Sequence, residues 1–204
     1  MKHNRLKQTG FTLIELIIVV IILGLLAVTA LPRYIGIQEQ AQRSTVEGVA
    51  GGLAAAIGLV RGQWEVLGRP DNNTISNFID YDTTQVGIDP DYGYPTSGVD
   101  ENNDVLTGAT TVTSLDREKC QAIFNTVLQS APASTISSVS DTIEKNTYLV
   151  RFEDNGSNDG TSDTCLYYLV NTLDFNAIPG DTLINSVRGI EYTPATGQVL
   201  VFGN

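Results

Sequence analysis

The sequence has almost no histidine. Its 204 residues include a single one, His3, and only two cysteines. A chain without imidazole beyond residue 3 excludes Ser–His and Cys–His catalysis, and two thiols alone cannot form a structural zinc site. No spacing of acidic residues indicates paired-carboxylate chemistry, and no glycine loop is of the phosphate-binding kind. We therefore expect a protein that is not an enzyme and that binds no cofactor.

Basic residues are also scarce. Lys and Arg number 12 against 23 Asp and Glu, which gives a formal net charge of −11. An acidic surface repels the phosphate backbone, so we expect no nucleic-acid binding through a basic patch. The acidity favours the solubility of an exported protein, and the length suffices for one domain and a membrane anchor.

One apolar run is long enough to cross a bilayer. It extends over residues 11–31, about 32 Å as a helix, against about 30 Å for the hydrocarbon core. No basic residue lies within it, whereas three precede it: Lys2, Arg5 and Lys7. By the positive-inside rule, the leader stays in the cytoplasm and the remainder lies outside.

Glu15 interrupts this run near its start. A charged side chain at the centre of a membrane helix costs about 2.5–3.5 kcal/mol on insertion scales. A plain anchor has no use for such a group, whereas a helix that later meets a cationic partner does. We predict that Glu15 pairs with a positive charge.

The run GFTLIE at residues 10–15, after a short basic leader, resembles the processing signature of type IVa prepilins. The resemblance implies that prepilin peptidase cleaves after Gly10 and N-methylates Phe11, and that Glu15 serves in assembly. Gly24 and Pro32 match further family positions, and we hypothesise that this stretch loses helical hydrogen bonds on assembly.

The resemblance also implies a division of the chain. Residues 1–10 would be the leader, residues 11–31 a membrane and filament-core helix, and residues 32–204 a globular domain outside the cytoplasm. Cleavage would remove three positive charges and take the net charge from −11 to −14. In a filament, the freed Phe11 amine of one copy would neutralise Glu15 of its neighbour and set the register between subunits.

Two other interpretations of the N-terminus remain open. A secretory signal peptide usually has an apolar region of 7–15 residues and a cleavage site after it, not before it. An uncleaved signal anchor fits the length but leaves Glu15 unexplained.

The two cysteines, Cys120 and Cys165, predict one disulfide, because both would lie outside the reducing cytoplasm. It would close a loop of about 46 residues, which the chain-entropy model equates with roughly 4 kcal/mol. The alternative is a pair of buried free thiols.

Beyond Pro32 the apolar residues recur at three- and four-residue steps, and these positions are Val46, Val49, Leu53, Ile57, Val60 and Trp64. The spacing predicts one long helix from Phe11 to about Trp64, kinked at Pro32. Five glycines lower its helix propensity, and we expect close approach of the globular part to explain them: Gly48, Gly51, Gly52, Gly58 and Gly62.

Residues 68–112 are rich in Asn, Asp, Gly and Pro, which predicts mostly turns and an extended connection. A second helix is expected from Asp116 to Ser130. Strands are expected at residues 148–153 and 165–170, and a closing hairpin at residues 189–202. The fold class is thus α+β, a long N-terminal helix packed on an antiparallel sheet of about four strands.

Residues 120–132, together with the runs at 92–95 and 192–197, are similar to mannose-sensitive haemagglutinin (MSHA) pilins. This resemblance implies a homopolymeric surface filament for attachment and biofilm formation. It further implies an inner-membrane precursor, an inner-membrane assembly platform and a cytoplasmic ATPase. Two alternatives stay open: a pseudopilin of a type II secretion system, and a membrane-anchored enzyme or binding module.

Three acids in one turn-rich segment, Asp154, Asp159 and Asp163, are weak candidates for calcium ligands. Hard oxygen ligands suit Ca²⁺. In a calcium loop that begins at Asn155, however, the twelfth position should hold an acid, and Leu166 occupies it. A solvated turn is the favoured interpretation.

Overall fold

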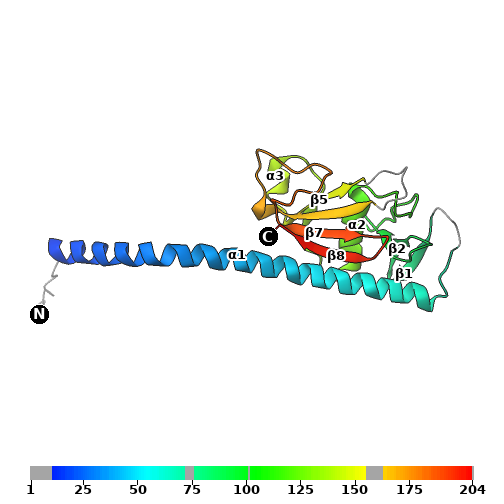
Figure 1. Ribbon diagram of the computed structural model, residues 1–204, viewed down its shortest axis with the longest axis horizontal. Coiled ribbons are helices and arrows are strands. Elements are labelled where there is room, and N and C mark those ends of the chain that lie inside the picture. The colour runs from blue at the N-terminus through cyan, green and yellow to red at the C-terminus, as the bar shows by residue number, and fades with distance from the viewer. Residues whose placement is uncertain (1–10, 72–75, 101, 155–162, 204) are drawn as a thin grey trace, which may run out of the picture. The chain divides into compact units, whose positions relative to one another are not determined.

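A computed structural model describes residues 11–71, 76–100, 102–154 and 163–203. The chain divides into two units, residues 1–44 and residues 45–204. Helix α1, Leu13–Val66, begins in the first unit and ends in the second (Figure 1). The long helix predicted from Phe11 to about Trp64 is confirmed, and it continues through Pro32 without a break in the helical assignment.

The larger sheet contains the strands that the sequence predicts. Strands β5 (Tyr148–Glu153), β6 (Thr164–Leu169), β7 (Gly189–Thr193) and β8 (Gln198–Phe202) pair in this order and are antiparallel. A two-residue strand, β4 (Ser134–Thr135), adds to β5 in parallel and was not predicted. The architecture is α+β, as expected, with a mixed rather than purely antiparallel sheet.

The prediction that residues 68–112 are mostly turn and loop is wrong for the middle of that segment. It contains a three-stranded antiparallel sheet of β1 (Phe78–Tyr81), β2 (Thr84–Ile88) and β3 (Pro95–Ser97). Asp82 and Thr83 join the first two strands with φ of 43° and 71°. Two positive φ values fit the tight primed turns of two-residue hairpins, a conformation that neither side chain favours strongly.

Helix α2, Arg117–Val127, follows the predicted boundaries closely. Asp116 caps it, since its side chain accepts a hydrogen bond from Lys119 N at 2.7 Å. The helix ends before the predicted Ser130, because Leu128 already has extended backbone angles. The short helices α3 (Ser140–Ile143) and η1 (Val170–Thr172) were not predicted.

Both faces of the larger sheet are covered. On one face, the second part of α1 and α2 form the main core with Tyr148, Val150 and Tyr167. On the other face, the segment 173–188 packs over Leu149 and Leu166. All six residues of β6 are therefore buried.

The predicted apolar stripe of α1 belongs to this main core. Five of its six positions are buried, and Val49 is half-buried. The explanation given for the α1 glycines is wrong, however. A Cβ built on Gly48, Gly51, Gly58 or Gly62 would meet nothing within 4 Å, and one on Gly52 would only touch Leu128 Cδ2 at 3.7 Å. Gly48, Gly51, Gly58 and Gly62 therefore lie on an open face of the helix, and of these five glycines Gly52 alone contacts the globular part.

Candidate functional site at the N-terminal helix

The start of α1 shows one half of a capping box, a hydrogen bond to the Thr12 side chain. The backbone N–H of Glu15 donates to Thr12 Oγ1 at 3.3 Å, and Leu16 N donates to Thr12 O at the same distance. Thr-x-x-Glu is the sequence signature of this arrangement, and residues 12–15 read TLIE. Sequence reasoning missed this signal, although the four letters contain it.

Glu15 lies in the first turn of α1, where the exposed backbone N–H groups favour a negative charge. Within the described part of the chain, Glu15 forms no ion pair, unlike the carboxylates of Glu65 and Asp181, which pair with arginines. Phe11 precedes the helix and is 85% exposed. Gly10, the other half of the predicted cleavage site, lies outside the described residues.

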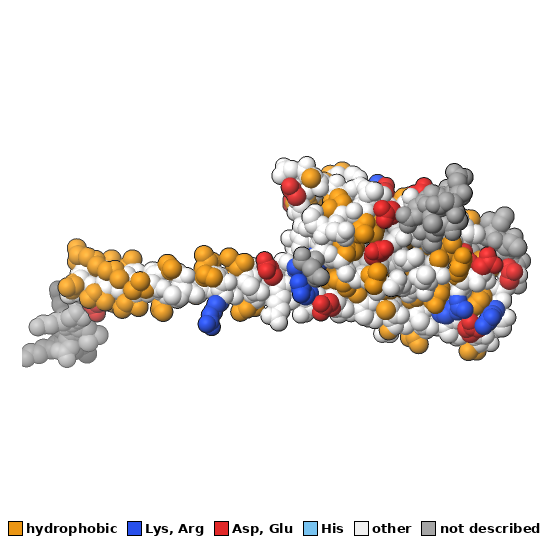
Figure 2. All heavy atoms as spheres, in the orientation of Figure 1, with side chains coloured by type: hydrophobic (Ala, Val, Ile, Leu, Met, Phe, Trp, Pro, Cys, Tyr) orange, Lys and Arg blue, Asp and Glu red, His pale blue; other side chains and the backbone are white. Residues whose placement is uncertain are grey.

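Residues 13–31, the first part of α1, are mostly apolar on every side of the helix. Within the described residues, α1 contains the one candidate membrane span, judged by length and composition, and none of that window is buried. Figure 2 shows hydrophobic side chains gathered along this part of the helix. A helix that is hydrophobic all round is stable only where lipid or protein surrounds it. This part of the helix is therefore suited to insertion into a membrane or to association with other protein chains.

Gly24 and Pro32 lie inside this exposed stretch. A Cβ on Gly24 would meet nothing within 4 Å, so no packing within the chain requires a glycine there. Pro32 has no N–H to donate to the carbonyl of Val28, which removes one helical hydrogen bond. A loss of further hydrogen bonds on assembly stays a prediction.

The predicted disulfide is present. Cys120 on α2 and Cys165 on β6 are bonded, with their Cα atoms 5.5 Å apart and both side chains fully buried. It joins the helix to the centre of the sheet, far along the chain from Glu15. Its contribution is therefore to the globular core and not to the chemistry of the N-terminus.

Among the residues that the structure describes, the three calcium candidates are not brought together into one cluster. Asp163 is buried, and its Oδ2 accepts a hydrogen bond from Leu115 N at 3.1 Å, which fixes the segment before α2. Asp154 is exposed, and Asp159 lies outside the described residues. Among the residues that the structure places, no three His, Cys, Asp or Glu side chains are grouped for a metal ion. Calcium binding stays the alternative to the favoured interpretation, a solvated turn.

Comparison with a family model identifies one match. Residues 5–31 match the prokaryotic N-terminal methylation motif, which covers the second half of the predicted leader, the predicted cleavage site, Glu15 and the apolar run. The match is confined to the N-terminus and does not extend to the globular part.

The curated relatives are filament and secretion proteins. A type IV narrow pilus major component, PilA5, of Thermus thermophilus is 39% identical over 51 residues, 25% of this chain and 44% of the relative. A type II secretion system core protein G of Pseudomonas aeruginosa is 31% identical over 100 residues, 49% of this chain and 61% of the relative. A type IV major pilin protein, PilE1, of Neisseria gonorrhoeae is 44% identical over 70 residues, 33% of this chain and 39% of the relative.

The chain thus spans less than two thirds of the length of these relatives. No solved structure matches it.

Proposed function

We infer that this chain is a structural subunit that polymerises into a surface filament. The inference rests on the N-terminal motif, the fold and the relatives, which together indicate a type IV pilin-like protein. The relatives are pilins and a secretion-system core protein, which favours a structural role over an enzymatic one. The observation that carries the proposal is Glu15, an acid in the first turn of α1 at the start of an apolar, exposed stretch, with no ion pair in the described chain.

The assembly step that we propose uses the charge of Glu15. Prepilin peptidase would cleave after Gly10 and methylate Phe11, which leaves an ammonium group four residues before Glu15. When the helix leaves the lipid for the filament core, the Phe11 amine of a neighbouring copy would pair with this carboxylate. Since an uncompensated charge in an apolar environment is costly, the pairing favours one axial position over the others.

The second part of α1 supports polymerisation independently. From Gly48 to Val60 it carries no charged residue, although the chain as a whole is acidic. Its open face presents Gly48, Gly51, Gly58 and the 64% exposed Leu59. Each helix glycine costs up to about 1 kcal/mol relative to Ala, and nothing inside the subunit explains that cost. Contact with another copy would explain it, because glycine allows helices to approach closely.

The cellular route follows from the same features. The precursor would sit in the inner membrane through residues 11–31, with its globular domain outside the cytoplasm. An inner-membrane assembly platform and a cytoplasmic ATPase would then extract it into the filament. Surface attachment and biofilm formation, on an MSHA-like pilus, are the finer part of this proposal.

Glu15→Val is the test of the assembly step. We expect normal membrane insertion and a processed N-terminus by mass spectrometry, while sheared surface filaments fall by about tenfold or more, because the neighbouring amine loses its partner. Glu144→Val, which removes the same charge from an exposed position of the globular unit outside α1, is the matched control and should leave filaments abundant. Normal filament yield in Glu15→Val would contradict the charge-pairing mechanism.

The pseudopilin role is the second candidate. It is favoured by the match to the secretion-system core protein, which extends over 100 residues, well beyond the N-terminal motif. A deletion strain separates the two roles: loss of long extracellular filaments supports the pilus, whereas loss of secreted proteins with no change in filaments supports the secretion system.

A further inference from the structure

The apolar surface of α1 continues beyond the predicted membrane run, residues 11–31. Tyr34, Ile35 and Ile37 are 60%, 51% and 64% exposed, and α1 passes through them without a break. From Leu13 to Ile37 there are 25 residues. As a helix they extend over about 37 Å, against about 30 Å for the hydrocarbon core of a bilayer. The apolar stretch is longer than the core, so its length alone allows more than one depth of insertion.

Two opposite charges interrupt this stretch, one near each end. Glu15 and Arg33 are 18 residues apart, and residues 16–32 between them carry no charge. In one continuous helix this separation is about 27 Å along the axis, close to the thickness of the hydrocarbon core, about 30 Å. At one depth, therefore, both charges lie at the boundaries of the core, where their side chains can reach the headgroups.

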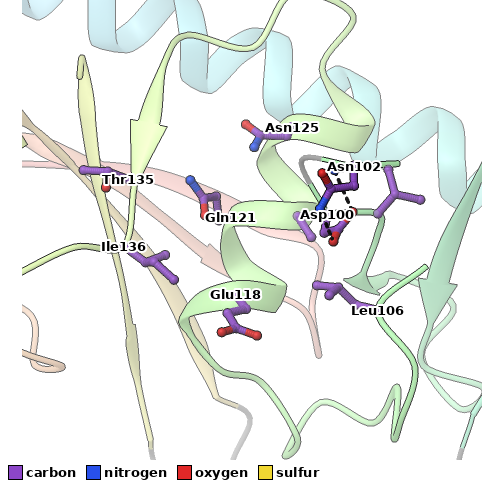
Figure 3. Close-up of a pocket in the computed structure, with 10 residues that line it drawn as sticks. Asp100, Asn102, Leu106, Glu118, Gln121, Asn125, Thr135 and Ile136 are labelled. Carbon is purple, nitrogen blue, oxygen red and sulfur yellow. Dashed lines mark hydrogen bonds between the residues drawn. The ribbon is translucent and has the colours of Figure 1, made fainter. Parts of the chain in front are cut away.

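The charge of Arg33 has no partner within the described chain. Its guanidinium forms no hydrogen bond or ion pair with any residue that the structure describes. In the globular unit, by contrast, Lys119 Nζ donates to Ala109 O at 2.9 Å, and Figure 3 shows Asp100 hydrogen-bonded to Asn102. Those charges are accommodated by their own unit, whereas a partner for Arg33 must come from its surroundings.

The chemistry at this end of the stretch fits the headgroup layer of a bilayer. A guanidinium binds phosphate oxygens through two parallel hydrogen bonds, and phosphate is the anionic group of phospholipid headgroups. The next residue is Tyr34, and tyrosine is enriched at membrane–water interfaces. Because lipid surrounds a single membrane helix, Arg33 and Tyr34 need not share one face to lie at this level.

We propose that Arg33 binds headgroup phosphates on the outer side of the membrane and, with Glu15 at the cytoplasmic boundary, sets the depth of the precursor in the bilayer. The inference rests on the membrane-anchored precursor of the proposed function, but not on polymerisation. Without Arg33, the uncharged run would extend from Leu16 to Ile37, about 33 Å, which fits the core at a second depth. The helix would then move toward the cytoplasm by up to about 6 Å, the rise of four residues.

The test measures the depth of spin labels on the full-length chain in vesicles of phosphatidylethanolamine and phosphatidylglycerol. The native cysteines are bonded and buried, so a single introduced cysteine is labelled alone. Labels are placed by Ile18→Cys and, in a separate protein, Ile37→Cys, both at exposed positions. Accessibility to oxygen against a water-soluble nickel complex gives the distance of each label from the nearer headgroup layer, whatever the orientation of the chain. We expect the Ile18 label about 5 Å inside the core and the Ile37 label outside it.

Three substitutions test the role of Arg33. Arg33→Leu should move the Ile37 label into the core and the Ile18 label out of it, each by about 3–6 Å. These opposite changes distinguish a sliding helix from a thicker bilayer. Arg33→Lys keeps the positive charge and should preserve the original depth. Arg43→Leu removes the same charge ten residues further along, outside the apolar stretch, and as the matched control should change neither depth.

The opposite results overturn the inference. Unchanged depths in Arg33→Leu, or an equal shift in Arg33→Lys, would show that the charge of Arg33 does not fix the position of the helix. Unchanged depths with a fall in filament yield would instead place Arg33 against another subunit, where a Glu15 displaced by about 27 Å could meet it. An Ile18 label accessible to water in the otherwise unsubstituted chain would contradict the membrane-anchored precursor itself, whereas an inserted helix at another depth contradicts only this inference.

Discussion

Residues 13–44 and residues 45–66 lie on one continuous helix, but their side chains meet different surroundings. In the first stretch large aliphatic side chains are exposed on every side, for example Leu23 at 59% and Leu31 at 62%. In the second, one face is buried, with Leu53 and Val60 at 0%, and the other face is open. The subunit therefore stabilises only half of its longest helix, and the other half depends on lipid or on other copies.

Loss of the disulfide should produce the largest difference between the two regions, because it should lower the stability of the globular unit and leave membrane insertion unchanged. A Cys120→Ser, Cys165→Ser double variant loses a cross-link that the chain-entropy model equates with about 4 kcal/mol. The melting temperature of the globular unit should fall by about 8–16 °C, because each kcal/mol corresponds to about 2–4 °C in a domain of this size. Membrane insertion through residues 11–31 should be unchanged in a fractionation assay. An unaltered melting temperature would show that core packing alone holds α2 to β6.

A matched pair of leucines compares the two halves directly. Leu53→Ala removes a fully buried side chain and should cost about 2–5 kcal/mol of unfolding free energy. Leu23→Ala makes the same change at a 59% exposed position and should cost the isolated subunit almost nothing. Urea denaturation of the two variants in detergent measures both values. Similar destabilisation by the two changes would mean that the first stretch packs within the subunit after all.

The parts of the fold that sequence reasoning found are those with strong local signals. The stripe from Val46 to Trp64 has helical spacing, α2 has an Asp cap, and β7 and β8 flank a turn at Gly197. The disulfide needed only two cysteines and a compartment outside the cytoplasm. Each of these signals lies within a few neighbouring residues.

The parts that it missed depend on contacts distant in the sequence. Strands β1 to β3 are three to five residues long, too short for a clear alternation, and β4 has two residues. Arg151 occupies a position where the alternation along β5 predicts a solvent-facing side chain, but it is 1% exposed. Its guanidinium donates to the carbonyls of Pro179, Ile136 and Ser137, and burial lowers its pKa to about 10. The segment 173–188 and the chain that follows β4 supply these carbonyls, and both are distant from Arg151 in the sequence.

The candidate site also has features that the sequence predicts and features that only the fold shows. Glu15, Phe11 and the apolar helix could be identified from the sequence because their meaning lies in local spacing. The contact between α2 and β4 could not, since Ser134 reaches Gln121 only through the fold. The open face of Gly48, Gly51 and Gly58 was misassigned for the same reason: sequence cannot show what a glycine faces.

The open face of α1 offers a smaller effect, with a sign that depends on its surroundings. Gly58→Ala should stabilise the isolated subunit by up to about 1 kcal/mol, because the added Cβ meets nothing and alanine favours the helix. Gly87→Ala is the contrasting control, since its Cβ would lie 2.7 Å from Ser97 Cβ and should destabilise. Melting curves of both variants check this. If another copy contacts Gly58, filament yield should fall although the subunit becomes more stable.

The smallest effect concerns the ion pair between α2 and the segment that covers the sheet. Arg117 Nε donates to Asp181 Oδ1 at 2.8 Å, and this hydrogen bond is the main cause that lowers the pKa of Asp181 below its ordinary value of 3.8. Because the folded-state pKa is the lower one, the contribution is fully present above the ordinary value and is lost as the pH falls through the folded-state pKa. The pair is partly exposed, so its contribution should not exceed about 1 kcal/mol.

Asp181→Asn tests this contribution. The variant should be less stable than the unsubstituted chain at pH 7, and the difference should shrink as the pH falls below the ordinary Asp value, in urea titrations of both proteins. Leu23→Ala, in the half of α1 that makes no contact with a core, should show no such convergence. A difference between Asp181→Asn and the unsubstituted chain that persists undiminished in acid would show that the aspartate acts through packing rather than charge. In that case the covering segment would be held by Arg151 and Tyr168, whose hydroxyl donates to Thr182 O at 2.7 Å, without help from the surface pair.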